Sequence, residues 1–370
     1  MKKLSFILVL FISLYSCNEE VVSDIDLTPA NAVQAEVQET DGEQKELLEK
    51  NLTLPVFTTF YRGRRTDGLY YNTSRNGRVY GPSTPFWNNG RTNNTPTSIR
   101  HGNNIFVYHR GRRTGDIFGQ AINVNKIERN VGFDDNFMAI PDQNPGSGPS
   151  AVKFDGKVYM FYATGNRIAY WRSDSPFFSP REGVFVITTA NFRGQSFGLP
   201  NADDSKELGL VVHQGRLYCF YVTDNDQLMY ISTDTGNAND WDRPSAANFN
   251  RSKSGLSAVS VLDNEILVTF AGITTNRLYV IRATQTNATT GELSFGNANW
   301  INSNAYTRNV AGIATNDTYR VSIAARVAQT GAIRIWKTDI VNGQVQNNWT
   351  EGSISSGATS EGVSHLYLGF

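Results

Sequence analysis

The sequence predicts an all-β protein, a six-bladed β-propeller whose ring is closed by the C-terminal strand. Three observations lead to this prediction. The 370-residue chain has 32 glycines and 12% aromatic residues but only 18% charged residues, a composition typical of many short strands joined by turns. A multi-strand unit recurs along residues 53–370. The last residues, 362–370, form a surplus strand pattern that can complete the first unit and leave no free edge.

The repeated unit is an apolar strand, a Gly/Asn/Asp turn, an aromatic-rich second strand, a variable loop and a third strand. The second strands, which begin 48 to 59 residues apart, are "VFTTFYRG" (56–63), "NIFVYHRG" (104–111), "KVYMFYATG" (157–165), "RLYCFYVTD" (216–224), "EILVTFAGI" (265–273) and "RVSIAARVA" (320–328). The third strands are "GLYYNTS", "DIFGQAI", "RIAYWRS", "QLMYIST", "RLYVIRA" and "AIRIWKT". This period, with three clear strands and a variable fourth, is typical of a propeller blade.

The number of blades depends on the C-terminal pattern. Six units are evident, and the first has no inner strand at its start, so "GVSHLYLGF" (362–370) is expected to supply one. Because "HLYLGF" can also be interpreted as a second strand, a seven-bladed ring is the alternative. A pair of β-sandwiches would explain neither the even spacing nor the duplicated loop described below.

The N-terminus has the pattern of a sorting signal. A basic start, "MKK", precedes an apolar stretch of eleven residues, "LSFILVLFISL", which is too short to span a bilayer and suits a signal peptide. The stretch ends in "LYSC", which resembles a bacterial lipobox. The resemblance implies that residues 1–17 are a lipoprotein signal and that Cys17 is lipidated. The following "NEE" resembles the export tag of surface lipoproteins in the Bacteroidota.

Charge separates a tether from a folded body. Residues 18–52 hold ten acidic residues and two lysines, a net charge of −8, and lack aromatic residues, so we interpret them as a flexible acidic tether. Residues 53–370, the predicted propeller, have a net charge of +6. Nucleic-acid binding is not expected, because this excess is mild and a lipid anchor places the protein outside the cytoplasm.

Five residues, RGRRT, occur twice, at Arg62–Thr66 and at Arg110–Thr114, at the same point of two successive units. In a propeller whose first strand is innermost, the loops that join second to third strands lie on one face. The sequence therefore predicts a positive surface made of Arg62, Arg64, Arg65, Arg110, Arg112 and Arg113. Guanidinium groups match carboxylate, sulfate or phosphate. Two solvated hairpin loops without a ligand are the alternative.

Aromatic and sulfur-containing residues have more than one interpretation. Trp87 and Trp171 are candidates for stacking on sugar rings, and core packing between sheets is the alternative. Cys219 alternates with aromatic residues in "RLYCFYV" and is expected in the core. The four histidines are scattered and no zinc-type Cys/His spacing occurs, so neither a metal nor a cofactor is expected.

Several turns resemble motifs of propellers that act on sugars. Ser232-Thr-Asp234-Thr-Gly236, followed by Trp241, is similar to a sialidase Asp box, and the resemblance implies a structural role for Asp234 in the turn. "GPSAVKFDGKVYMFY" with "IAYWRSDSP" looks like a blade of five-bladed glycoside hydrolases, and "GAIRIWKTD" with "VQNNWTEG" looks like a blade of fungal fucose lectins. Each resemblance covers one or two blades.

A catalytic pattern does not accompany these resemblances. Ala139-Ile140-Pro141 matches only the end of the arginine-containing segment of sialidases. A glycosidase needs two carboxylates that face one pocket, and no such pair can be assigned from the sequence.

The sequence therefore predicts a lipid-anchored, cell-surface protein of the outer membrane that binds glycans, most of all acidic ones, through the arginine face. Two alternatives stay open. One is a glycoside hydrolase or lyase of the sialidase-like propeller type. The other is a non-catalytic subunit of an outer-membrane assembly in which a propeller face docks a protein.

Overall fold

The computed structural model describes residues 57–74, 79–85, 92–127, 135–140, 145–178, 184–187, 201–302, 304–316 and 319–368. The chain divides into two compact units, Met1–Leu52 and Thr53–Phe370, and all described residues belong to the second. The predicted signal peptide with Cys17, the acidic tether and Trp87 lie outside the described residues. In the described ranges, no helix has the length and apolar character needed to cross a membrane.

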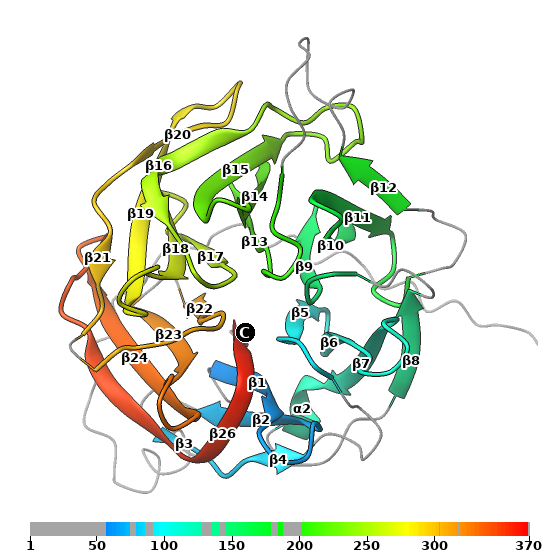
Figure 1. Cartoon of the computed structure of the whole chain (residues 1–370), viewed down its shortest axis with the longest axis vertical. Helices are drawn as coiled ribbons and strands as arrows, with labels where there is room; N and C mark the ends of the chain where they lie inside the picture. Colours follow the sequence, from blue (N-terminus) through cyan, green and yellow to red (C-terminus); the bar gives the residue numbers. More distant parts are fainter. Residues whose placement is uncertain are drawn as a thin grey trace, which may run out of the picture. The chain divides into compact units, whose positions relative to one another are not determined.

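Four antiparallel sheets follow one another along the chain (Figure 1). The first has the order β5 (Thr97–His101), β6 (Asn104–Arg110), β7 (Ile117–Asn123), β8 (Asp135–Ile140), with one helical turn, α2 (Val124–Ile127), after β7. The second has β9 (Ser150–Phe154), β10 (Lys157–Thr164), β11 (Arg167–Ser173), β12 (Val184–Ile187). The third has β13 (Gly209–His213), β14 (Arg216–Val222), β15 (Gln227–Thr233), β16 (Ser245–Arg251). The fourth has β17 (Ser257–Val261), β18 (Glu265–Ala271), β19 (Leu278–Asn287), β20 (Glu292–Phe295), with β21 (Asn299–Trp300) also paired to β19.

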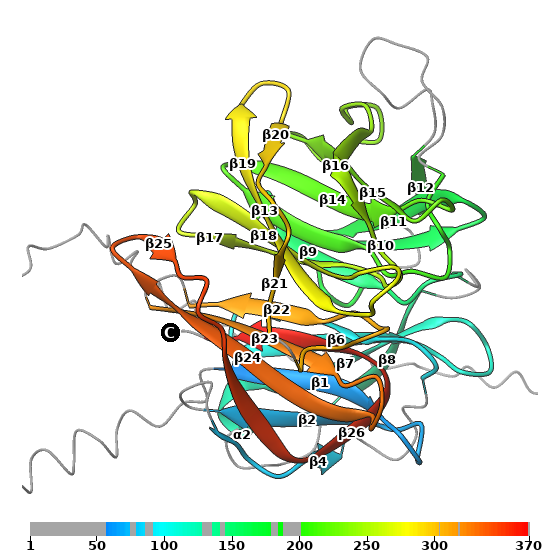
Figure 2. The same cartoon turned by 60° about the vertical axis from the view of Figure 1, so that its left-hand side comes forward.

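A nine-stranded sheet joins the two ends of the body (Figure 2). Its path is β22 (Gly312–Thr315), β23 (Arg320–Arg326), β24 (Ala332–Val341), β26 (Thr350–Tyr367), β1 (Phe57–Gly63), β2 (Leu69–Ser74), β4 (Thr84–Pro85); β25 (Gln344–Val345) pairs with β24 and β3 (Val79–Tyr80) with β26. The first part of β26 pairs with β24, and its last residues pair with β1, Phe57 opposite Tyr367. The C-terminal strand therefore lies beside the first strand of the body.

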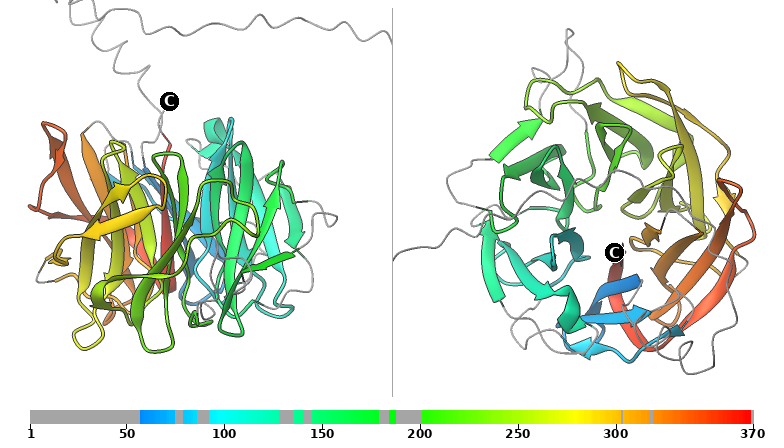
Figure 3. Two further views of the ribbon diagram at one scale, coloured as in Figure 1. Left: turned by 90° about the horizontal axis from the view of Figure 1, so that it is seen from above. Right: turned by 180° about the vertical axis from the view of Figure 1, so that it is seen from behind.

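The inner strands of the sheets lie around the centre of the body (Figures 1 and 3). A cavity of about 420 Å³ lies between them. Residues of β5, β9, β13, β17, β22 and the end of β26 line it. Hydroxyl groups join neighbouring inner strands: Ser98 Oγ lies 2.8 Å from Ser364 Oγ, and Ser150 Oγ donates to the Leu208 carbonyl at 2.7 Å. The sheets and this cavity form the arrangement of a β-propeller.

Aromatic side chains fill the spaces between adjacent sheets. Trp241 is fully buried, with its ring 5.7 Å from that of Phe161 and 5.9 Å from that of Tyr170. Burial of one such side chain contributes about 1.5–3 kcal/mol. Cys219 is also fully buried, in the same cluster, which confirms its expected place in the core.

The Asp-box-like turn follows β15, at the end opposite to the β14–β15 loop. The N–H groups of Thr235 and Gly236 donate to Thr233 Oγ1, at 3.2 and 3.0 Å. Asp234 has an oxygen 3.7 Å from an Arg216 nitrogen. Thr233 therefore accepts the N–H groups of the turn, which is the structural role that the resemblance implies for Asp234. Trp241 packs into the core next to this turn.

Candidate functional site

The two RGRRT segments form loops of the same geometry between the second and third strands of neighbouring sheets. In the β1–β2 loop the Gly63 N–H donates to the Gly68 carbonyl at 2.7 Å, and in the β6–β7 loop the Gly111 N–H donates to the Asp116 carbonyl at 2.7 Å. The threonine of each segment closes its loop, because Thr66 Oγ1 and Thr114 Oγ1 accept a backbone N–H two residues on, at 3.4 and 3.3 Å.

A stacked ring pair lies beneath each glycine. The rings of Tyr61 and Tyr70 are 5.9 Å apart with an interplanar angle of 19°, and those of His109 and Phe118 are 5.9 Å apart at 25°. A Cβ atom added to either glycine would lie less than 3.0 Å from a ring carbon of Tyr70 or Phe118. The glycine of RGRRT is therefore a packing requirement, as is expected where a backbone approaches another group closely.

The same loop recurs between β18 and β19, without arginine at the positions of Arg62, Arg64 and Arg65. The Gly272 N–H donates to the Arg277 carbonyl at 2.9 Å, Thr275 Oγ1 accepts from the Arg277 N–H at 3.3 Å, and Phe270 stacks on Tyr279 at 5.4 Å. Ala271, Ile273 and Thr274 stand where the first loop has Arg62, Arg64 and Arg65. The glycine and the threonine therefore determine the backbone of the loop, and the side chains at the three arginine positions can vary.

A fourth loop shows when the glycine is dispensable. Between β23 and β24 the Val327 N–H donates to the Ala332 carbonyl at 2.8 Å, and Thr330 Oγ1 accepts from the Ala332 N–H at 3.2 Å. The pair at the loop base is Ala325 opposite Arg334, so no ring pair lies beneath the loop and valine fits. Alignment of the repeats could have shown that the glycine is required only above an aromatic pair, because the two occur together in the three loops that have the glycine.

One carboxylate holds the two arginine loops together. Asp67 forms ion pairs with both Arg62 and Arg112. Arg62 also pairs with Glu361 at 2.8 Å, and its side chain is only 13% exposed. The two loops therefore meet on one face, as the repeat pattern predicts, and two of the six arginines are largely neutralised by acidic partners.

The other four arginines differ in how much of each guanidinium is available. Arg64 Nη1 donates to the Thr330 carbonyl at 2.7 Å, and Arg110 Nη1 donates to the Gly146 carbonyl at 3.2 Å. Burial lowers the pKa of Arg110. Arg65 and Arg113 are exposed, and neither forms a hydrogen bond or ion pair with another described residue. These two side chains are the best placed to meet a ligand.

The positive surface also includes Arg326, which the comparison of the two RGRRT segments missed. Arg326 donates to the Thr359 carbonyl at 2.9 Å and to Asn309 Oδ1 at 3.0 Å. Burial lowers its pKa, and the charges of Glu361, Arg64 and Arg308 act on it as well. Arg326 occupies the position of Arg62 in the fourth loop, so aligning the loops would have found it.

A pocket of about 370 Å³ lies next to the first arginine loop. We call it the Tyr70 pocket; its lining consists of Tyr61, Gly63, Arg64, Arg65, Thr66, Tyr70, Ser83 and Ala358. The Tyr61 hydroxyl donates to Ser83 Oγ at 2.5 Å, and the Tyr70 hydroxyl lies 3.0 Å from Thr66 Oγ1. The Arg64 N–H donates to the Ala358 carbonyl at 3.2 Å, which fixes the loop against β26.

Trp171, one of the two tryptophans predicted to contact a sugar, is not on this surface. Trp171 is 5% exposed and packs in a core cluster with Phe106 and Tyr108, which is the packing alternative for this residue. Its indole therefore has no open face for a sugar ring. Trp87 lies outside the described residues.

The central cavity contains one carboxylate, Glu207, among the described residues that line it. Glu207 Oε1 accepts the Thr95 N–H at 3.3 Å. Burial raises the pKa of Glu207, and the charge of Glu207 in turn contributes to the raised pKa of Glu361. Over the described ranges, no group of three His, Cys, Asp or Glu side chains could hold a metal ion.

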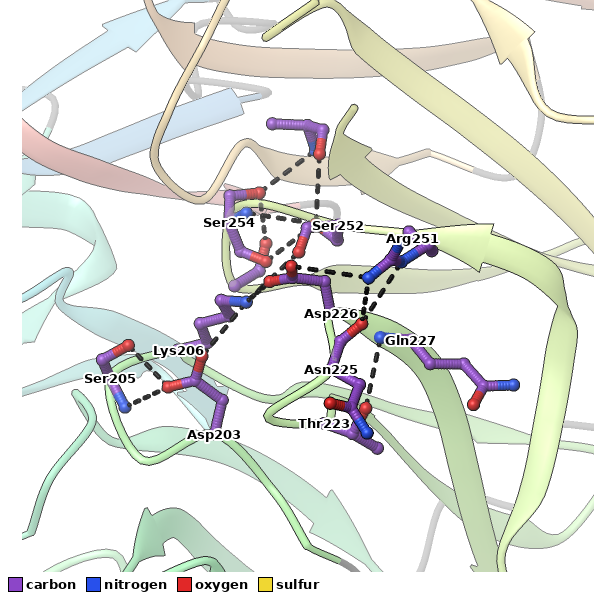
Figure 4. Close-up of polar contacts among 12 residues, drawn as sticks. Asp203, Ser205, Lys206, Thr223, Asn225, Asp226, Gln227, Arg251, Ser252 and Ser254 are labelled. Atoms are coloured by element: carbon purple, nitrogen blue, oxygen red, sulfur yellow. Dashed lines mark hydrogen bonds and ion pairs between the residues drawn. The ribbon is translucent and has the colours of Figure 1, made fainter. Parts of the chain in front are cut away.

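The third sheet has a different polar cluster at the corresponding loop (Figure 4). Lys206 Nζ lies 2.7 Å from Asp226 Oδ1 and 3.1 Å from Asp203 Oδ2, and it donates to the Ser252 carbonyl at 3.2 Å. The lysine is 8% exposed. Its charge is balanced by the two aspartates, so this loop offers no excess positive charge comparable to the arginine loops.

Comparison with known proteins supports the fold. No protein-family model and no curated protein sequence matches the chain. Among solved structures, the BP39L lectin from Burkholderia pseudomallei matches with a TM-score of 0.52 and 13% identity over 83% of this chain and 82% of that chain. A triple arginine-to-alanine mutant of AofleA from Arthrobotrys oligospora matches with a TM-score of 0.51 and 12% identity over 85% and 91%. The SapL1 lectin in complex with α-methyl fucoside has a TM-score of 0.49 at 13% identity, over 82% and 98%.

The protein has a β-propeller fold. At these identities the likeness concerns the fold alone, so function has to be argued from the arginine loops and the Tyr70 pocket.

Proposed function

We propose that the protein binds acidic glycans through the face that carries the two RGRRT loops. The observation that carries this proposal is the junction of the loops at Asp67, which gathers six arginines and leaves Arg65 and Arg113 exposed. Guanidinium groups bind carboxylates and sulfates with two parallel hydrogen bonds. The fold of BP39L, a lectin by its printed name, supports a binding role for such a propeller.

We also propose the architecture that the repeats predict, six blades with the first completed by the end of β26. Two features support it: six strands contribute to the lining of the central cavity, and β26 pairs with both β24 and β1. The seven-bladed alternative would need a further inner strand.

A lipid anchor at the outer-membrane surface is part of this proposal. It rests on the signal pattern that ends at Cys17. Labelling of Cys17 with a fatty-acid analogue, with Cys17→Ala as the control, tests the anchor.

The binding proposal is tested by pull-down with immobilised polysaccharides. Polygalacturonate and dextran sulfate should retain the protein, and dextran should not. Replacing all six arginines by alanine should abolish retention, whereas replacing Arg243, an exposed arginine on the β15–β16 connection at the opposite end of the strands, should have little effect. Unchanged retention of the six-arginine variant would show that the ligand binds elsewhere.

A glycoside hydrolase or lyase is the second candidate, and Glu207 is the observation in its favour. A buried carboxyl group with a raised pKa is suited to donate a proton. If Glu207 has this role, release of reducing ends or unsaturated products from acidic polysaccharides should stop in Glu207→Gln. A role as a non-catalytic subunit would be recognised by co-purification of an outer-membrane protein from detergent-solubilised membranes.

A further inference from the structure

The Tyr70 pocket combines features that the other described loops do not share. Arg64 and Arg65 form one side, Ala358 lies on the β26 side, and the stacked phenols of Tyr61 and Tyr70 contribute two hydroxyl groups. Its volume of about 370 Å³ is at the lower end of the range of about 300–1,000 Å³ for ligand sites. The pocket is therefore of a size for one sugar unit and not for a long segment of polymer.

The charge in the pocket is available for a ligand. Arg65 is exposed and has no hydrogen bond or ion pair to a described residue, and Arg64 uses one nitrogen for the Thr330 carbonyl. Asp67, the acidic residue closest to Arg64 and Arg65 in the sequence, forms ion pairs with Arg62 and Arg112. Because Asp67 already has two cationic partners, it competes little for Arg64 and Arg65.

The Tyr61 hydroxyl in the pocket is neutral at physiological pH. Burial raises the pKa of Tyr61 to about 12, so its phenol keeps its proton, which it donates to Ser83 Oγ. The hydroxyls of Tyr70 and Thr66 lie 3.0 Å apart, and either can donate to the other. Hydroxyl groups that both donate and accept are suited to the hydroxyls of a pyranose ring.

Each of the two other loops lacks either the arginine pair or the pair of phenol hydroxyls. In the second arginine loop the ring pair is His109 with Phe118, which brings no hydroxyl group. In the β18–β19 loop the pair is Phe270 with Tyr279, but Ile273 and Thr274 replace the arginines. Of these three loops, only β1–β2 unites a guanidinium pair with phenol hydroxyls.

We propose that the Tyr70 pocket is a subsite for a single anionic pyranose, with the carboxylate or sulfate on Arg64 and Arg65 and the ring against Tyr70. This inference rests on the proposed glycan-binding function and names the unit that the site recognises. Arg113 then contacts a neighbouring unit of the polymer mainly through its charge, because the ring pair of its loop, His109 with Phe118, has no phenol hydroxyl.

The test is a titration with monosaccharides, followed by protein NMR or calorimetry. The probes are methyl glucuronoside, galactose 6-sulfate and, as the neutral control, methyl glucoside. We expect the anionic sugars to bind and the neutral one not to bind at the same concentrations. A response to only one of the two anionic sugars would assign the anion as carboxylate or as sulfate.

Four variants locate the binding site. Arg65→Ala should weaken the binding of the anionic sugar about tenfold or more, the equivalent of one charge-assisted hydrogen bond, and Tyr70→Phe about threefold. Arg113→Ala, in the neighbouring loop, should weaken it less than Arg65→Ala, and the matched control Tyr279→Phe should leave it unchanged. All four side chains are at least partly exposed, so the variants should fold.

The outcomes separate this inference from the proposed function. If polygalacturonate and dextran sulfate still bind but Arg65→Ala and Arg113→Ala affect the monosaccharide equally, the subsite is wrong and the wider function stands. Monosaccharide binding that does not respond to either Arg65→Ala or Tyr70→Phe would have the same meaning. If no acidic polymer binds the wild-type protein, the proposed function fails and the subsite with it.

Discussion

The β1–β2 loop and the β18–β19 loop have the same backbone hydrogen bonds, the same closing threonine and the same glycine above stacked rings. They differ at the positions that face solvent, where Arg64 and Arg65 stand in one loop and Ile273 and Thr274 in the other. The comparison separates two roles within one short motif. Glycine and threonine fix the loop, and the residues between them decide what the loop can bind.

The largest expected effect concerns the β6–β7 loop, which has the same geometry. Its ring pair contains His109 where the β1–β2 loop has Tyr61 and the β18–β19 loop has Phe270. Burial lowers the pKa of His109 to about 4, below its usual 6.5. Between these values the unfolded chain binds a proton that the folded protein does not, so stability falls as the pH falls from about 6.5 to about 4.

His109→Phe should therefore lose less stability than the wild type over this interval. One unit of pKa difference corresponds to about 1.4 kcal/mol, so we expect a difference between the two proteins of about 2–3 kcal/mol between pH 7 and pH 4. Urea denaturation at both pH values measures it. Parallel pH curves for the two proteins would show that His109 is not held neutral.

The glycines provide the second test of the shared scaffold. Gly63→Val and Gly272→Val should each lower the free energy of unfolding by about 1–3 kcal/mol, because the new side chain would overlap the ring of Tyr70 or Tyr279. Val327→Ala, at the corresponding position without a ring beneath it, should cost less than either. Chemical denaturation compares the three. A tolerated valine at only one of the two glycines would break the equivalence of the loops.

Asp67 tests whether the joined loops are held by charge. Asp67→Asn removes the carboxylate shared by Arg62 and Arg112, and it should lower stability by about 1 kcal/mol, the upper range for a partly exposed ion pair. The same change raises the positive charge of the face, so dextran sulfate should bind about threefold more tightly at low salt. Weaker binding would mean that Asp67 is needed to orient the arginines.

The smallest effect is expected when two arginines are introduced into the β18–β19 loop. Ile273→Arg combined with Thr274→Arg gives the β18–β19 loop the charges of the β1–β2 loop on the same backbone. Stability should change by less than about 0.5 kcal/mol, as is usual for surface substitutions, and affinity for dextran sulfate should rise about twofold. A large loss of stability would show that the two backbones are not interchangeable.

The propeller arrangement could be predicted because each blade repeats a pattern that the sequence displays. Alternating apolar residues give the strands, and the surplus strand at 362–370 corresponds to the end of β26, which pairs with β1. The finer structure of the strands was harder to predict. A single strand, Thr350–Tyr367, pairs with β24 in its first part and with β1 in its last part, and no local pattern indicates where such a strand passes from one partner to the next.

The candidate site could be predicted only in outline. The duplicated RGRRT drew attention to the two loops of the candidate site, but its letters do not show that Arg62 and Arg112 share Asp67 while Arg65 and Arg113 have no such partner among the described residues. Those differences arise from tertiary contacts, such as the one between Arg62 and Glu361, which is 299 residues away. Trp171 shows the opposite limit, since an aromatic residue in a strand has the same local pattern whether it faces the core or a ligand.

The central claim is that exposed arginines of the two joined loops bind acidic glycans. The most direct measurement is a calorimetric titration of polygalacturonate into the wild type, into Arg65→Ala with Arg113→Ala, and into Arg243→Ala, a variant at the opposite end of the strands. We expect the double variant to bind at least about tenfold more weakly, with a smaller dependence of affinity on salt, and Arg243→Ala to match the wild type. Equal affinities for the wild type and the double variant would contradict the claim.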